Sequence, residues 1–223
     1  MHDIFVRYIK QQENGGILMT KLILSSTNPS NKILTLDMYM IFRKINLKHK
    51  KILYISCDTP NAVIKTYCHS ILGFPIHNIF SIDDGLPAEI PEYVLVDGRN
   101  SYELLTYLKG NSLYEYIIDI VANGSTYIGF GAGAALAGND IIASSYCYAN
   151  YSFPSDLTAF GFVDGCVLPH VDDPCRFLLV SESNAYNCNC FYAIPDNIAI
   201  KINENGEVEN GSIYMYKPSQ YRV

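Results

Sequence analysis

Short apolar runs alternate with longer segments of helical spacing along the first part of the chain. The runs have the length of buried strands, and they cover residues 21–26, 51–56, 78–83, 92–98 and 126–130. The segments between them predict helices over residues 32–46, 61–73, 101–108 and 112–123. Strands that alternate with helices in this way predict an α/β fold, with a mostly parallel sheet and helices on both of its faces.

Residues that begin and end helices agree with this order. Asp58, Thr59 and Pro60 provide a capping residue and a proline where the second helix begins. Gly73 and Gly124 stand where the second and fourth helices are expected to end.

The pattern changes after residue 165. Strand-like segments now follow one another with turn signals between them, over residues 176–182, 190–196, 197–203 and 211–217. The polar stretch at 203–211, NENGEVENG, is typical of a hairpin connection. We therefore expect an antiparallel C-terminal edge on the parallel core.

Composition narrows the class of protein. The 223 residues are 49% hydrophobic and 17% charged, and the formal net charge is -6. These values predict one globular domain over residues 19–223, with an N-terminal extension over residues 1–18 that lacks the features of a secretory signal. The acidic balance disfavours a nucleic-acid partner, and no apolar run reaches the ~18 residues of a membrane span.

The seven cysteines are odd in number and irregular in spacing. Cys188 and Cys190 form the closest pair, and they lack the spacing of a zinc site. Free thiols in a reducing cytoplasm are the simplest interpretation. We expect a cytoplasmic protein, a monomer or a homodimer, with no metal and no cofactor.

Residues 129–133, GFGAG, have the form of the turn that presents a catalytic nucleophile after a buried strand. Serine or cysteine normally stands in the middle of that turn, and here the middle residue is Gly131. The backbone N–H groups of Ala132 and Gly98 are candidate donors to an oxyanion, and His170, which follows a proline, is a candidate base. All of these residues are expected at the carboxyl ends of the strands.

The chain resembles the peptidase E family, which comprises α-aspartyl dipeptidases and cyanophycinase relatives. The segments that carry the resemblance are residues 93–138, LPHVDD at 168–173 and FYAIPDNIAI at 191–200. The resemblance implies a three-layer sandwich similar to class I glutamine amidotransferases. It also implies metal-free hydrolysis of aspartyl peptides by a serine, with His170 as the base.

The match to the family's site is uneven. Gly98 and Asn100 fit a G-G-N turn, but Asp97 stands where the first glycine of that turn is expected. Arg99 also lies within the turn, and its large side chain is expected to narrow the pocket. Gly131 replaces the serine. The neighbouring serines at 125, 144 and 145 do not lie on the turn.

Two further site positions follow from the resemblance. The family's acid would fall near Tyr146, and the nearest acid, Asp140, comes too early in the sequence, so the triad acid is expected to be missing. Asn100 and Arg176 are candidate contacts to a substrate, although a structural arginine explains Arg176 equally simply.

Three hypotheses remain open at this point. The first is a peptidase E-like fold that has lost catalysis and binds a small peptide or amino-acid ligand. The second is an active hydrolase that uses another nucleophile or a water held by His170. The third is a regulatory or structural protein in which the ancestral site has no role.

Overall fold

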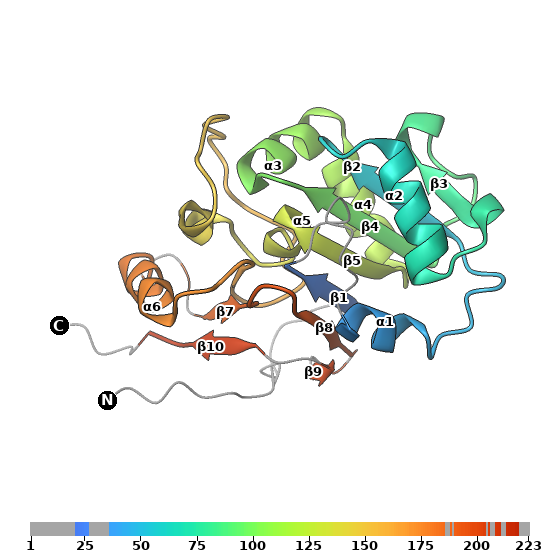
Figure 1. Ribbon diagram of the computed structural model, residues 1–223. Coiled ribbons are helices and arrows are strands. Elements are labelled where there is room, and N and C mark those ends of the chain that lie inside the picture. The colour runs from blue at the N-terminus through green and yellow to red at the C-terminus, as the bar shows by residue number, and fades with distance from the viewer. Residues whose placement is uncertain are drawn as a thin grey trace.

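The computed structural model describes residues 21–26, 36–185, 188, 190–203, 205, 208–210 and 213–218. The expected extension at 1–18 and residues 32–35 of the expected helix at 32–46 lie outside the described residues. Within them, the chain folds into a seven-stranded sheet with helices on both faces and a smaller three-stranded sheet beside it (Figure 1).

The larger sheet confirms the expected parallel core. Five parallel strands stand side by side in the order β3 (Ile79–Ser81), β2 (Ile52–Ser56), β4 (Tyr93–Gly98), β5 (Thr126–Gly131) and β1 (Leu22–Ser25). Antiparallel β8 (Ala199–Ile202) and β9 (Val208–Asn210) then extend the β1 edge. The strand β5 is therefore central in this sheet, with β4 on one side and β1 on the other.

Alternate residues of each central strand enter two different cores. Val94 and Val96 of β4 pack with α3 (Ser101–Gly110), α4 (Leu113–Ala122) and α5 (Ala132–Ala135). Leu95 between them packs with α1 (Leu36–Phe42) and α2 (Asn61–Tyr67) on the opposite face. This alternation is the period of two that a strand buried on both faces imposes.

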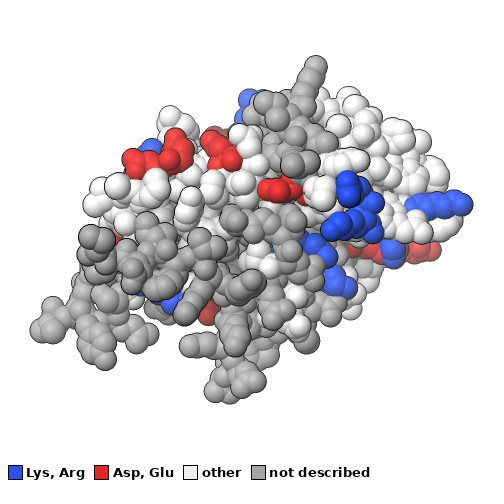
Figure 2. All heavy atoms as spheres, turned by 60° about the horizontal axis from the view of Figure 1, so that its bottom comes forward, with Lys and Arg blue, Asp and Glu red and all other residues white. Residues whose placement is uncertain are grey.

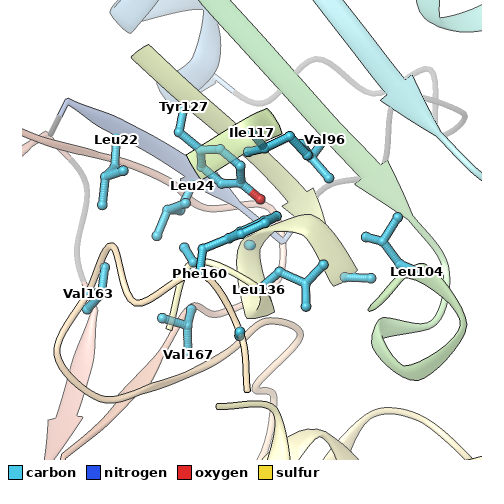
Figure 3. Packing of buried hydrophobic residues seen from close by; sticks show 14 of the residues in the cluster. Leu22, Leu24, Val96, Leu104, Ile117, Tyr127, Leu136, Phe160, Val163 and Val167 are labelled. Carbon is cyan, nitrogen blue, oxygen red and sulfur yellow. The ribbon is translucent and has the colours of Figure 1, made fainter. Parts of the chain in front are cut away.

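The core on the α5 side is organised around aromatic rings. Figure 3 shows the rings of Tyr127 and Phe160 beside each other above Leu136, and their centroids are 5.6 Å apart. Tyr127 is completely buried, and its hydroxyl donates a 2.6 Å hydrogen bond to the carbonyl oxygen of Gly133. This bond links the beginning of β5 to the short helix that follows the strand.

The smaller sheet contains β10 (Tyr214–Tyr216), β7 (Phe191–Ala193) and β6 (Cys166–Leu168) in that order. Strands β6 and β7 are parallel, and β10 is antiparallel to β7. The C-terminal strands therefore divide between two sheets, whereas the sequence pattern predicted one antiparallel edge.

The expected strand at 176–182 is wrong, because these residues belong to the helix α6 (Pro174–Ser183). Asp173 caps this helix by accepting hydrogen bonds from the backbone N–H groups of Cys175, at 2.9 Å, and Arg176, at 3.2 Å. Pro174 occupies the first turn, where a missing N–H costs nothing. The cap and proline outweigh the strand-like apolar run.

The start of α2 also differs from the expectation. Pro60 is the N-terminal flanking residue of this helix, and no side chain caps it. The side chains of Asp58 and Thr59 instead bind residues at the end of β4, as described below. After α2, residues 68–72 form one π-helical turn, and Gly73 ends it with a φ of 92°.

Charged side chains of both signs lie close together on the described surface. Figure 2 shows Lys and Arg grouped towards the side that carries α1, with acidic side chains beside them. Lys50 pairs with Glu92 at 3.4 Å, and Lys51 pairs with Glu89. No helix among the described residues is long and apolar enough to cross a membrane.

Candidate functional site

The turn at Gly131 has the strained backbone of a nucleophile elbow. Gly131 ends β5 and begins α5, with a φ of 51° and a ψ of -112°. This φ is positive, and glycine adopts it without a steric penalty. Gly133 completes the turn, because a Cβ at this position would lie 2.0 Å from the carbonyl oxygen of Val96. Only glycine lets α5 rest directly on β4.

His170 faces this elbow, as the sequence predicted. A Cβ at position 131 would lie 3.7 Å from His170 Nε2. His170 lies just after β6 and has a φ of 58°. Its side chain is 38% exposed. A hydroxyl carried by such a Cβ could reach the hydrogen-bonding distance that a nucleophile and its base require.

The expectation that the triad acid is missing is wrong. His170 Nδ1 lies 2.7 Å from Asp196 Oδ1. Asp140, the acid considered from the sequence, instead accepts a hydrogen bond from the backbone of Ile142 in its own loop. Tyr146, near the position where the resemblance placed an acid, is buried and bonds Asp172 through its hydroxyl.

Parallel strand pairing brings His170 and Asp196 together. Leu168 at the end of β6 is the register partner of Ala193 at the end of β7. Near the end of each strand the chain has an apolar residue, a proline and then a polar residue, in the segments LPH at 168–170 and IPD at 194–196. This repeated pattern is the sequence signal that could have identified Asp196.

The end of β1 holds the Asp196 loop against the main sheet. Ser26 is fully buried, and its hydroxyl donates to the carbonyl oxygen of Pro195 at 2.7 Å. The backbone N–H of Ser26 donates to Ile198 at 3.3 Å. Because β1 lies next to β5, these bonds place Asp196 beside the elbow.

Tyr148 is the side chain at the elbow that the sequence did not reveal. Its hydroxyl oxygen lies 3.8 Å from the position of a Cβ on Gly131, and the carbonyl oxygen of Gly98 lies 3.2 Å from the same point. The hydroxyl is buried and has no hydrogen-bond partner among the described residues. Burial raises the pKa of Tyr148 well above its ordinary value, so the hydroxyl stays protonated.

Asn100 and Arg176, the predicted substrate contacts, both hold the segment that carries Tyr148. Asn100 caps α3 through Oδ1, and its Nδ2 donates to the carbonyl oxygen of Ala149 at 2.7 Å. Arg176 donates to the carbonyl oxygen of Tyr146 at 2.6 Å and stacks on the Tyr146 ring. Their observed contacts are therefore structural.

Asp97 is a buried acid at the carboxyl end of the sheet, on the face opposite α5, whereas the Asp196 side chain is exposed. Its side chain is inaccessible, and Thr59 donates a 2.7 Å hydrogen bond to it. Burial, with a further contribution from the charge of Asp58, raises its pKa to about 7. Asp58 also accepts the backbone N–H of Arg99 at 2.7 Å, and the Arg99 side chain is exposed to solvent.

In the described part of the chain, the remaining serine, metal-ligating and cysteine side chains do not add a second reactive group. The hydroxyl of Ser125 donates to the carbonyl oxygen of Pro91. Among the described residues, no group of three His, Cys, Asp or Glu side chains could hold a metal ion. All seven cysteines are described, and none of them forms a disulfide.

Comparisons with known proteins point to one peptidase family. The model of peptidase family S51 matches residues 80–209. Peptidase E of Escherichia coli strain K12 and that of Shigella boydii serotype 18 are each 40% identical to the chain over 67 residues, which is 30% of this chain. The match spans only 29% of the length of these curated relatives.

Two solved structures share the fold. A protein assigned as peptidase E in Listeria monocytogenes EGD-e superposes with a TM-score of 0.61 at 20% identity, over 90% of this chain and 99% of that one. A peptidase from an acI-B1 Actinobacterium gives a TM-score of 0.56 at 12% identity, over 91% of this chain and 89% of the other. The family model covers more than half of the sequence, and the chain belongs to peptidase family S51.

Proposed function

We propose that this protein binds a small peptide or amino-acid ligand at the Gly131 elbow and does not carry out the covalent chemistry of a serine peptidase. The observation that carries the proposal is the glycine itself, which has no atom that can attack a carbonyl. Loss of the nucleophile costs about 10⁶ in turnover where it has been measured. The chain is therefore expected to be silent in an ordinary dipeptidase assay.

The other groups at the elbow support the binding of a peptide, as in the peptidase E family. The backbone N–H groups of Ala132 and Gly98 are the proposed donors to a ligand carbonyl oxygen. His170, oriented by Asp196, would face the bond next to that carbonyl. By the resemblance to peptidase E, peptides with an N-terminal aspartate are the first ligands to test.

Gly131→Ser tests the proposal. With no triad acid, this change would restore little activity, because disrupting the third group costs about 10⁴ in a well-studied serine protease. The contact between His170 and Asp196 removes that obstacle. We therefore expect G131S to cleave Asp-Xaa dipeptides and the unmodified protein to bind them without releasing aspartate.

Gly131→Ala is the matched control, because it adds the same Cβ at the same positive φ but no hydroxyl. It should bind dipeptides as G131S does and show no turnover. Calorimetry measures the binding, and chromatography of the products measures the turnover. Efficient cleavage by the unmodified protein would overturn the proposal, and so would the absence of dipeptide binding to all three forms.

We also propose a cytoplasmic location and a monomeric or homodimeric state. The seven free thiols support a reducing compartment. Fractionation and light scattering would test these two points.

A further inference from the structure

Three polar groups from different parts of the chain converge on one point beside Gly131. The carbonyl oxygen of Gly98, His170 Nε2 and the hydroxyl of Tyr148 lie 3.2, 3.7 and 3.8 Å from the position that a Cβ would occupy. A serine side chain would fill this space. Glycine places no side chain between these three groups.

The chemistry of these groups defines what fits between them. The Gly98 carbonyl can only accept a hydrogen bond. Asp196 accepts from His170 Nδ1–H, which leaves Nε2 as an acceptor, and the protonated Tyr148 hydroxyl is a donor. A small molecule between these groups must donate hydrogen bonds to the Gly98 carbonyl and to His170 Nε2 and accept one from Tyr148. A water molecule can make all three hydrogen bonds.

Tyr148 is held firmly in this place. Asn100 donates a hydrogen bond to the carbonyl oxygen of Ala149, directly after Tyr148. Arg176 donates to the carbonyl oxygen of Tyr146, two residues before it. The thiol of Cys147 donates to the carbonyl oxygen of Pro169, directly before His170, at 2.9 Å. An unpaired buried hydroxyl is costly, so such a fixed tyrosine requires a partner in the space that it faces.

We propose that Gly98, His170 and Tyr148 hold a hydrolytic water in place of a serine hydroxyl, and that the protein hydrolyses activated acyl esters without a covalent intermediate. The proposal rests on the proposed function, because the acyl group must bind at the same elbow. It adds an activity that the loss of the serine does not remove.

The reaction balances with water as the only co-reactant. The water oxygen forms a bond to the ester carbonyl carbon while His170 Nε2 takes a water proton, and Asp196 stabilises the imidazolium. The Ala132 N–H stabilises the oxyanion. The carbonyl then re-forms, the bond to the leaving oxygen breaks with its electron pair, and the proton of His170 passes to the leaving group or to solvent.

This route favours esters over peptides. A nitrophenolate leaves without prior protonation, whereas a peptide amine must receive a proton as the bond breaks. Binding and oxyanion contacts alone retain about 10³ to 10⁴ of rate enhancement in a protease without its nucleophile. Detectable ester hydrolysis is therefore compatible with silence in a dipeptidase assay.

The test is steady-state and burst-phase hydrolysis of p-nitrophenyl acetate by the full chain. We expect linear release of nitrophenol with no burst and a rate that is slower in heavy water. His170→Ala should lower the rate above background by about 100-fold or more. Tyr148→Phe should lower it by about fivefold, while Tyr151→Phe, which removes a hydroxyl from an exposed residue of the same loop, should leave it unchanged.

Three results would overturn the proposal. One is an H170A rate equal to the wild-type rate, because the other four histidines would then explain the reaction. Another is acetylation of His170, seen by mass spectrometry or as a burst, because the imidazole would then be the nucleophile. The third is a Y148F rate equal to that of wild type.

The two proposals fail in different ways. If G131S cleaves dipeptides but the unmodified protein does not hydrolyse the ester, the water site is wrong and the ligand site stands. If neither G131S nor the unmodified protein binds dipeptides, the proposed function is wrong.

Discussion

Replacing the buried Asp97 by asparagine should change how the stability of the protein depends on pH. Asp97 has no accessible surface, and its pKa rises from 3.8 to about 7 because burial disfavours the charged carboxylate. In the unfolded chain the same carboxyl is ionised above about pH 4. Folding therefore favours its protonated form, and its contribution to stability is present below pH 4 and lost as the pH rises through about 7.

The size of the effect follows from the shift. A shift of about three pKa units corresponds to about 4 kcal/mol over the full range, at 1.36 kcal/mol per unit. Between pH 5 and pH 8, linkage gives a loss of about 2.5 kcal/mol for a folded pKa of about 7. Asparagine does not titrate, so Asp97→Asn removes this slope.

Urea unfolding of wild type and D97N at pH 5, 6, 7 and 8 measures the effect. The free energy of unfolding of wild type minus that of D97N isolates Asp97, because the other groups titrate in both proteins. This difference should fall by about 2.5 kcal/mol from pH 5 to pH 8. Asp58→Asn removes a neighbouring charge that raises the Asp97 pKa, and it should move the fall to lower pH. A difference that is constant or that rises with pH would refute the reasoning.

Two further changes test the local structure. Gly133→Ala should cost about 3 kcal/mol or more in urea unfolding, because its Cβ would overlap the carbonyl oxygen of Val96. Gly110→Ala is the control, because this glycine ends α3 and nothing lies within 4 Å of the position of its Cβ. It should be neutral or slightly stabilising. If G133A were as stable as G110A, the close approach of α5 to β4 would be contradicted. Asp173→Ala should lower the free energy of unfolding by about 1 kcal/mol, because it removes the cap of α6. An unchanged thermal midpoint would show that the cap contributes nothing.

The parallel core could be predicted from the sequence because its signals are local. The buried runs of β4 and β5 have a length and composition that only a central strand accommodates, and the glycines at 129, 131 and 133 mark the elbow directly. The helix α6 was predicted as a strand because its apolar run hid the Asp173 cap and Pro174 that begin it.

Two members of the site depend on pairings that span the chain. Asp196 meets His170 only because β6 and β7 align in parallel, and neither strand indicates its partner. Tyr148 reaches the elbow through the contacts of Asn100 and Arg176 with its loop. The segments LPH and IPD are a local signal for Asp196, but its pairing with His170 follows from tertiary structure, and no sequence signal marks Tyr148.

The central claim is that position 131 is the nucleophile position of an otherwise assembled site. Intact-mass measurement after treatment with a fluorophosphonate tests it most directly, because this reagent labels a serine hydroxyl that a base activates. G131S should gain one adduct, located at position 131 by peptide mapping, and the double variant G131S/H170A should not. Wild type and G131A should remain unlabelled. Labelling of wild type to the same extent, or no labelling of a folded G131S, would contradict the claim.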